Sequence, residues 1–217
     1  GYVLANAGID RSNVQSDEDW VLMLPVDPDG SAERIRKILQ DRFSVHIGVI
    51  IADSVGRAWR LGTTGMALGS AGVVALDNLN DYYSVQLKYD RLNQLKKFDS
   101  FSFHSIDIDN PIALSDCLAD YTIDDVIHLA AQAGVRYSID NPQAYGRSNL
   151  IGFLNILEWV RSHPVDHFIY ASSSSVYGNT ERVPFSTNAT ADKPVSLYAA
   201  TKRANELMAE SYSHLYN

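Results

Sequence analysis

Residues 61–81 read LGTTGMALGSAGVVALDNLND, and this stretch joins two features that a dinucleotide-binding fold keeps apart. A glycine-rich turn is followed at once by an apolar strand, residues 73–76, which ends on Asp77. In a dinucleotide-binding unit a full helix follows the glycines, and the acidic residue arrives about 20 residues later. Asp77 stands 8 residues after Gly69, which leaves no space for that helix. The stretch therefore predicts either an unusual cofactor loop or a junction of two unrelated sequences.

Composition limits the classes of function that are open. Of the 217 residues 46% are hydrophobic and 20% charged, as expected for one or two globular domains with buried cores. The net charge of −8 argues against nucleic acid or an anionic membrane as a partner. No apolar run approaches the roughly 20 residues that span a bilayer, and there is no signal-peptide pattern. The single cysteine, Cys117, suits a reducing compartment, so we expect a cytoplasmic protein.

Before residue 73 the sequence predicts one helix and one strand. Ser31 can cap a helix whose apolar residues share one face, namely Ala32, Ile35, Ile38, Leu39 and Phe43. Residues 45–51 have the length and β-branched content of a buried strand. The glycine-studded residues 56–72 show no periodicity. The chain starts at Gly1 and stops at Asn217 inside a helical pattern, which indicates a fragment.

From residue 73 onward, predicted strands and helices alternate. Strands are expected at residues 73–77, 101–107, 124–131 and 166–173. Helices are expected around residues 87–95, 110–121, 149–160 and 198–216. In the second of these helices Asn110 can act as the cap, and Pro111 suits the first helical position. This alternation predicts a parallel sheet with helices on both faces.

Tyr198 and Lys202 carry the sharpest chemical signal. They stand four residues apart on the last predicted helix, so their side chains share a face. A phenol has an unperturbed pKa of about 10, and a nearby ammonium lowers that pKa toward neutral. A bare Tyr-x-x-x-Lys pair usually lies on a solvated face. Residues 172–178, SSSSVYG, favour the catalytic interpretation, because they place hydroxyls at the carboxyl end of a parallel strand, where such sheets bind ligands.

Five segments carry a resemblance to a known family: LDNLNDYY (76–83), HLAAQAGVRYSIDNP (128–142), SNLIGFLNILE (148–158), YASSSSVYG (170–178) and PVSLYAATKRANELMAESYSHLY (194–216). They resemble the NAD-dependent epimerase/dehydratase family of extended short-chain dehydrogenases/reductases, and within it the UDP-glucuronate 4-epimerases. The resemblance implies an α/β fold, a partial Rossmann-like doubly wound parallel sheet that binds NAD. It also implies C4 epimerisation of a UDP-sugar by transient oxidation and re-reduction. Dehydratases typically place an Asp-Glu pair where Ser174 and Ser175 stand, which favours epimerisation.

The resemblance also assigns roles to single residues. Tyr198 would take the proton from the sugar 4-hydroxyl, and Lys202 would hold the nicotinamide ribose. Ser173, or its neighbour Ser174, would be the catalytic hydroxyl. Asp77 would bind the adenosine ribose and favour NAD over NADP. The other positions implied to contact the cofactor are Asn78, Asp107, Ile108, Leu129, Ala130, Ala131, Asn149 and Ser172. A buried structural hydrogen bond is the alternative for Asn149, and His128 is expected in the core.

Residues 1–72 resemble a different family, on the segments ANAGIDRSNV (5–14), LMLPVDPDGSAERIR (22–36) and GVIIADSVGRAWRLGTTGMALGSAG (48–72). These segments resemble the γ-glutamyl ligases that add glutamate to the deazaflavin coenzyme. Asp10 and Asp53 are the implied ligands of a divalent metal, with plain loop acids as the alternative. We therefore expect a junction near residues 71–73, with an unrelated αβ segment in place of the first βα unit of a truncated NAD-binding domain, residues 73–217.

Three functions follow from these resemblances. The leading one is an NAD-dependent nucleotide-sugar epimerase core, in which NAD binding and turnover are weak or absent because the glycine-rich phosphate cradle is replaced. The second is metal- and GTP-dependent ligase chemistry from residues 1–72. The third is an inactive chimeric fragment that associates through an exposed sheet edge. A homodimer is compatible with the sequence, and residues 45–51 could fill a sheet edge parallel to residues 73–76.

Overall fold

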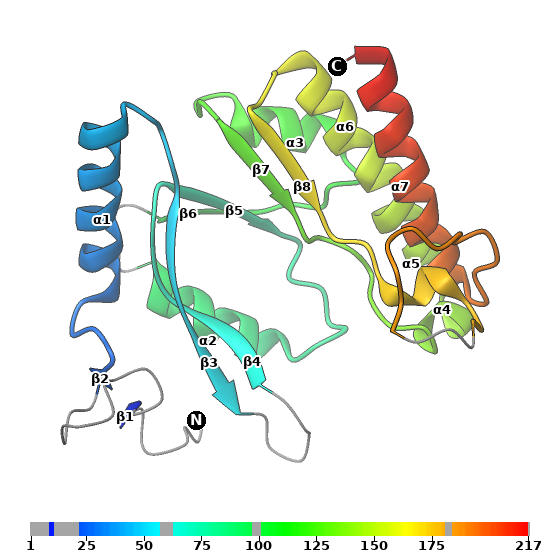
Figure 1. Cartoon of the computed structure of the whole chain (residues 1–217), viewed down its shortest axis with the longest axis horizontal. Coiled ribbons are helices and arrows are strands. Elements are labelled where there is room, and N and C mark those ends of the chain that lie inside the picture. The colour runs from blue at the N-terminus through cyan, green and yellow to red at the C-terminus, as the bar shows by residue number, and fades with distance from the viewer. Residues whose placement is uncertain (1–8, 11–21, 57–62, 97–100, 181–183, 217) are drawn as a thin grey trace. The chain divides into compact units, whose positions relative to one another are not determined.

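The computed structural model describes residues 9–10, 22–56, 63–96, 101–180 and 184–216 (Figure 1). The chain divides into two compact units, residues 1–75 with 80–103, and residues 76–79 with 104–217. Within the described ranges, no helix combines the length and the apolar character that crossing a membrane requires.

The first unit begins with a short antiparallel pair, β1 (Ile9–Asp10) and β2 (Leu22–Met23), followed by helix α1 (Pro28–Phe43). The predicted cap, Ser31, is wrong. The carboxylate of Asp27 caps the helix by accepting the Gly30 N–H at 2.9 Å, whereas the Ser31 hydroxyl donates to the Asp27 carbonyl at 2.7 Å. An ionised acid at the helix start adds a favourable interaction with the helix dipole, which explains why Asp27 prevails.

Strands β3 (Val49–Gly56) and β4 (Thr63–Ala71) form an antiparallel hairpin that pairs Val49 with Ala71 (Figure 1). Residues 56–72, for which the sequence indicates no regular element, contain strand β4. The possibility that residues 45–51 lie parallel to residues 73–76 is not realised, because β3 pairs with β4. Glycines depress strand propensity, so the pattern of this segment hides a strand that packing against α1 stabilises.

Gly69 lets α1 approach β4 closely. A Cβ at this position would lie 2.4 Å from the carbonyl carbon of Pro28 and 2.6 Å from the backbone nitrogen of Asp29. The Asp29 carboxylate is buried there and accepts the Ser70 N–H at 2.6 Å. The glycine thus serves helix–strand packing.

We expect the substitution Gly69→Ala to lower the free energy of unfolding by about 1–3 kcal/mol, because backbone atoms of α1 must move to admit the methyl group. Urea denaturation followed by circular dichroism measures this change. The matched control is Gly146→Ala, where a Cβ meets open space and the change should be neutral or stabilising. Equal stability of the two variants would contradict the packing role of Gly69.

In the next part of the chain, β5 (Val73–Asp77) pairs with β6 (Phe101–Ser105), and helix α2 (Val85–Leu95) lies between them in sequence. Helix α3 (Pro111–Leu118) starts as predicted, because the Asn110 side chain accepts the N–H groups of Ile112 and Ala113, each at 3.1 Å. Strand β7 (Asp125–His128) runs parallel to β8 (His167–Tyr170), which confirms the predicted parallel pairing. Among the described residues these strands form separate two-stranded sheets.

The helix predicted around residues 149–160 is present as the end of the π-helix η2 (Gly146–Ile151) and the α-helix α6 (Gly152–Ser162). Two short helices precede it, α4 (Tyr137–Asp140) and α5 (Pro142–Tyr145). The 3₁₀ turn η3 (Ser174–Tyr177) and α7 (Leu197–Tyr216) complete the second unit. Phe153 of α6 is fully buried, with its ring centroid 5.3 Å from that of His128 and 5.4 Å from that of Tyr170. This cluster forms the core beneath β7 and β8.

Candidate functional site

Lys202 joins helix α7 to the end of β8. Its ammonium donates to the Ala171 carbonyl at 2.9 Å, and the residue is only 3% exposed. Burial lowers the pKa of this amine, because the protein interior disfavours the charged form. Ala171 directly precedes residues 172–175, four serines that we call the serine run. The structure therefore brings Lys202 beside the segment whose hydroxyls the sequence singles out.

Tyr198 lies one turn before Lys202 on α7. Its ring is half-buried and meets the ring of Tyr145 edge-on, with the centroids 6.1 Å apart. No described residue hydrogen-bonds the Tyr198 hydroxyl, and the described hydrogen bond of the Lys202 ammonium goes to Ala171. Tyr198 and Lys202 therefore share the predicted helix face without a direct hydrogen bond between their side chains.

The serine run adopts two different roles. The Ser173 side chain caps η3 by accepting the Ser175 N–H at 3.2 Å. The exposed Ser172 donates its hydroxyl proton to the carboxylate of Glu206 on α7, whose other oxygen accepts from Arg203 at 2.6 Å. Sequence reasoning missed Glu206, although its place four residues after Lys202 puts it on the same helix face.

Asn149 lies in the π-helix and is 1% exposed. Its side chain accepts the Gln132 N–H at 2.7 Å and donates to the Gln132 carbonyl and to the Thr201 hydroxyl, each at 3.1 Å. The Asn205 side chain in turn donates to the Asn149 carbonyl at 2.6 Å. The Asn149 side chain thus makes the buried structural hydrogen bonds that were the alternative to a cofactor contact. These bonds fix the segment after β7 to α7. π-helical turns of this kind often occur at functional sites.

Tyr145 supports the same segment and was not predicted. It is fully buried, and its hydroxyl donates to the Ala133 carbonyl at 2.7 Å and to the Gly134 carbonyl. Gly134 has a φ of 98°, a conformation that favours glycine. The predicted cofactor positions just before it are accessible, because Leu129 is exposed and Ala130 and Ala131 are half-buried.

The ends of β5 and β6 meet through side chains. Asn78 donates to the Asp107 carboxylate at 3.0 Å, and the exposed Asp77 accepts the Leu79 N–H at 2.6 Å. The structure thus gathers the predicted positions Asp77, Asn78 and Asp107. Ile108 differs from them, because its side chain is buried and a Cβ on Gly152 would lie 2.6 Å from its Cγ1.

No described contact joins Asp10 and Asp53, the two residues that the ligase resemblance implies as metal ligands. Asp10 lies in β1 and Asp53 in β3, and both side chains lie outside the described ones. Among the described side chains, no group of three or more His, Cys, Asp or Glu residues could hold a metal ion.

His128 is buried under the site, as expected for a core histidine. Burial, followed by the nearby charge of Lys202, lowers its pKa to about 4. The folded chain therefore keeps this imidazole neutral at pH values where the unfolded chain protonates it.

We expect the free energy of unfolding to fall by about 3 kcal/mol as pH drops from about 6.5 to about 4, because the unfolded state binds more protons in this window. Below this window His128 contributes no further loss. Urea denaturation at stepped pH measures the slope, and His128→Leu should reduce it. His214→Gln, at an exposed site on α7, should keep it. Identical slopes for the wild type and His128→Leu would exclude the buried imidazole as the cause.

Two family models match the chain. Residues 69–217 match the model described as GDP-mannose 4,6 dehydratase, and residues 1–103 match that of F420-0:gamma-glutamyl ligase. The two matches overlap over residues 69–103.

Among the similar proteins, "Protein CapI" of Staphylococcus aureus is 54% identical over 67% of this chain and 43% of its own length. A UDP-glucuronate 4-epimerase of Thermodesulfobacterium geofontis is 48% identical over 73% of this chain and 48% of its own length. The crystal structure of UDP-glucuronic acid 4-epimerase from Bacillus cereus, in complex with UDP-glucuronic acid and NAD, aligns with a TM-score of 0.60 at 33% identity. That alignment covers 66% of this chain and 44% of the crystallised one. The chain thus spans less than half the length of these relatives.

Proposed function

The chain belongs to the GDP-mannose 4,6 dehydratase family, and from this premise we propose that residues 73–217 form the NAD-binding core of a nucleotide-sugar 4-epimerase. The proposed substrate class is a UDP-sugar of the UDP-glucuronate type. The observation that carries the proposal is the Lys202 ammonium on the Ala171 carbonyl, because it places the Tyr-x-x-x-Lys helix against the serine run.

The residues at two strand ends fit part of NAD. Asp77 is exposed after β5 and suits a ribose diol, whose hydroxyl groups would donate to its carboxylate. Lys202 would hold the nicotinamide ribose beside β8. When bound, NAD would accept a hydride from the sugar and return it. The glycines of residues 65–69 fit poorly, because they belong to β4 and precede no helix N-terminus that could bind phosphate. We therefore propose weak binding.

In the proposed mechanism each side chain has one task. Tyr198, one helical turn before Lys202, takes the proton of the sugar 4-hydroxyl. Ser173 donates a hydrogen bond to the same sugar oxygen and stabilises the charge that develops there. Inversion requires that the keto sugar turn over, so that C4 would receive the hydride on its other face. Tyr198 then returns the proton to the C4 oxygen, and the reaction has no net redox change.

We further propose that the junction between the ligase-like and the epimerase-like sequence lies near residues 71–73. Supporting this proposal, β4 ends at Ala71 and β5 begins at Val73, with only Gly72 between them. Gly72 has a φ of 68°, a sharp change of direction that suits a join between two segments.

We expect the chain to prefer NAD over NADP, because the Asp77 carboxylate repels a 2′-phosphate. Asp77→Asn should reduce this preference by about tenfold, or about 1.4 kcal/mol, in dissociation constants from NMR titration. Asp81→Asn, on the following loop, is the charge-matched control and should leave the preference unchanged. Micromolar affinity of the wild type would contradict the proposed weak binding, and unaltered preference in Asp77→Asn would contradict the role of this residue.

A second candidate function rests on the match of residues 1–103 to the γ-glutamyl ligase family. In this case Asp10 and Asp53 would hold a divalent cation together with GTP. Calorimetry with Mn²⁺ should then show tighter binding in the presence of GTP, and Asp53→Asn should abolish the enhancement. Mn²⁺ binding that GTP leaves unchanged would dismiss this candidate.

A further inference from the structure

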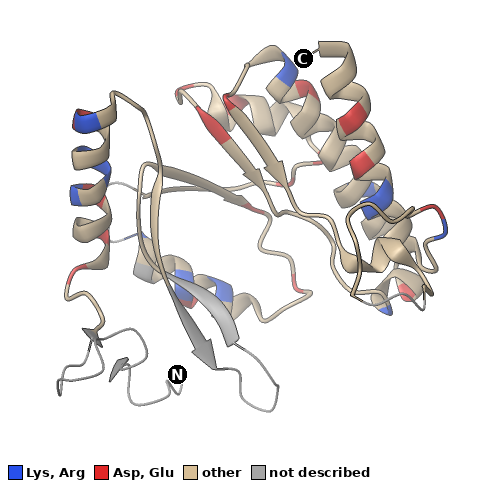
Figure 2. Cartoon of the chain, in the orientation of Figure 1, with Lys and Arg blue, Asp and Glu red and all other residues tan. Residues whose placement is uncertain are grey.

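Glu206 makes contacts that the proposed mechanism does not use. It lies one turn beyond Lys202 on α7, a helix that carries both acidic and basic residues (Figure 2). One carboxylate oxygen accepts the hydroxyl proton of Ser172, and the other accepts from the Arg203 guanidinium at 2.6 Å. Because each carboxylate oxygen has its own hydrogen-bond partner, the orientation of the carboxylate is fixed.

This contact determines the polarity of the Ser172 hydroxyl. A serine hydroxyl has one proton to donate and two lone pairs, whereas an ionised carboxylate only accepts. With its proton directed at Glu206, Ser172 can offer a ligand only its lone pairs. Ser173 is the reverse case, because its oxygen accepts the Ser175 N–H and no described residue accepts its proton. Two adjacent hydroxyls therefore present opposite hydrogen-bonding character.

We infer that Glu206 is a positioning residue that holds Ser172 as an acceptor for the carboxamide N–H of the nicotinamide ring. This inference rests on the proposed function, in which Lys202 holds the nicotinamide ribose. Ser172 is exposed and directly follows Ala171, whose carbonyl binds the Lys202 ammonium. A donor group on the ring next to that ribose matches the lone pairs of Ser172. Ser173, with its free proton, remains the partner of a sugar oxygen.

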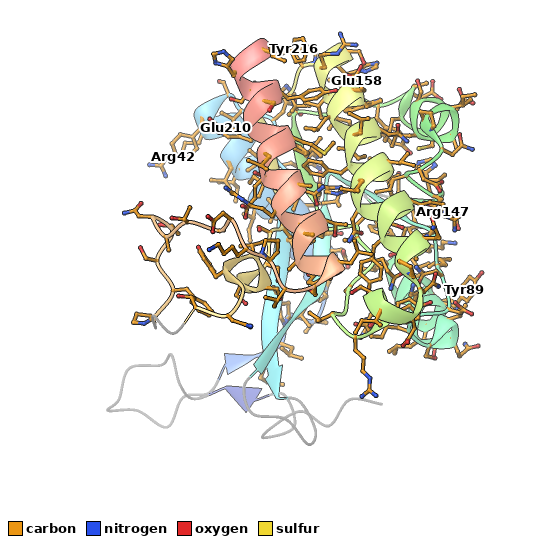
Figure 3. All side chains as sticks on the ribbon, turned by 90° about the vertical axis from the view of Figure 1, so that its right-hand side faces the viewer. Arg42, Tyr89, Arg147, Glu158, Glu210 and Tyr216 are labelled. Carbon is orange, nitrogen blue, oxygen red and sulfur yellow. The ribbon has the colours of Figure 1, made fainter. Side chains whose placement is uncertain are left out.

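The test compares two reduced dinucleotides that differ in one donor. NADH carries the carboxamide N–H, and its 3-acetylpyridine analogue has a methyl group there. Dissociation constants are measured by NMR titration for the full chain and for Glu206→Gln, Ser172→Ala and Glu210→Gln. Glu210, labelled in Figure 3, lies one turn further along α7 and is the charge-matched control.

For the wild type and Glu210→Gln we expect NADH to bind about fivefold more tightly than the analogue, as one hydrogen bond provides. Glu206→Gln and Ser172→Ala should each weaken NADH binding about fivefold and leave the analogue unaffected. This selective loss is a readout that a merely structural role would not produce.

Other outcomes distinguish failure of the Glu206 positioning role from failure of the proposed function. Equal losses for both dinucleotides, or equal behaviour of Glu206→Gln and Glu210→Gln, would overturn the positioning role and leave the proposed function standing. Unchanged NADH binding in both Glu206→Gln and Ser172→Ala would overturn the nicotinamide assignment. A wild type that binds neither dinucleotide would refute the proposed function, and the inference with it. If Glu206→Gln fails to fold, Ser172→Ala still decides, because it removes only an exposed hydroxyl.

Discussion

The hydrogen bond from the buried Lys202 ammonium to the Ala171 carbonyl is the constraint on which the site depends. An ammonium group that is removed from water is costly unless it is hydrogen-bonded, so this contact strongly favours one rotation of α7 about its axis. Residues spaced by four along a helix share a face. Glu206, one turn after Lys202, consequently faces the same strand end, where it accepts the hydroxyl proton of Ser172.

A second contact holds the same helix from the other strand. Thr201 on α7 accepts from Asn149, which binds both backbone groups of Gln132 after β7. Helix α7 is thus fixed to the ends of β7 and β8, the two strands that run parallel in the described sheet. Parallel strands present their carboxyl ends at one edge, so the two contacts hold α7 at that edge. The neutral His128 beneath them is consistent with this arrangement, because a charged imidazole would be repelled by Lys202.

The sequence predicts this unit well where local signals agree with the fold. The Asn110 cap with Pro111, the strands β7 and β8 and the long helix α7 all follow from periodicity and capping chemistry. Partners distant in sequence were not predictable in this way. Glu206 binds a serine 34 residues away, and Asn149 binds a threonine 52 residues away. A buried polar side chain must form a hydrogen bond, but the residues around it in the sequence do not indicate which distant group will be its partner.

In the first third of the chain a local signal was misleading, because its glycines suggested a turn where the structure has a strand. Glycines suggest a turn because they tolerate unusual backbone angles, but they also allow two backbones to approach closely. Gly69 takes the second role, against the start of α1, and the chain passes from β4 through Gly72 directly into β5. No helix N-terminus follows these glycines to receive a phosphate. The predicted cofactor positions Asp77, Asp107 and Lys202 all belong to the second unit, whereas Gly69 belongs to the first, so these glycines and the predicted cofactor residues are parts of different units.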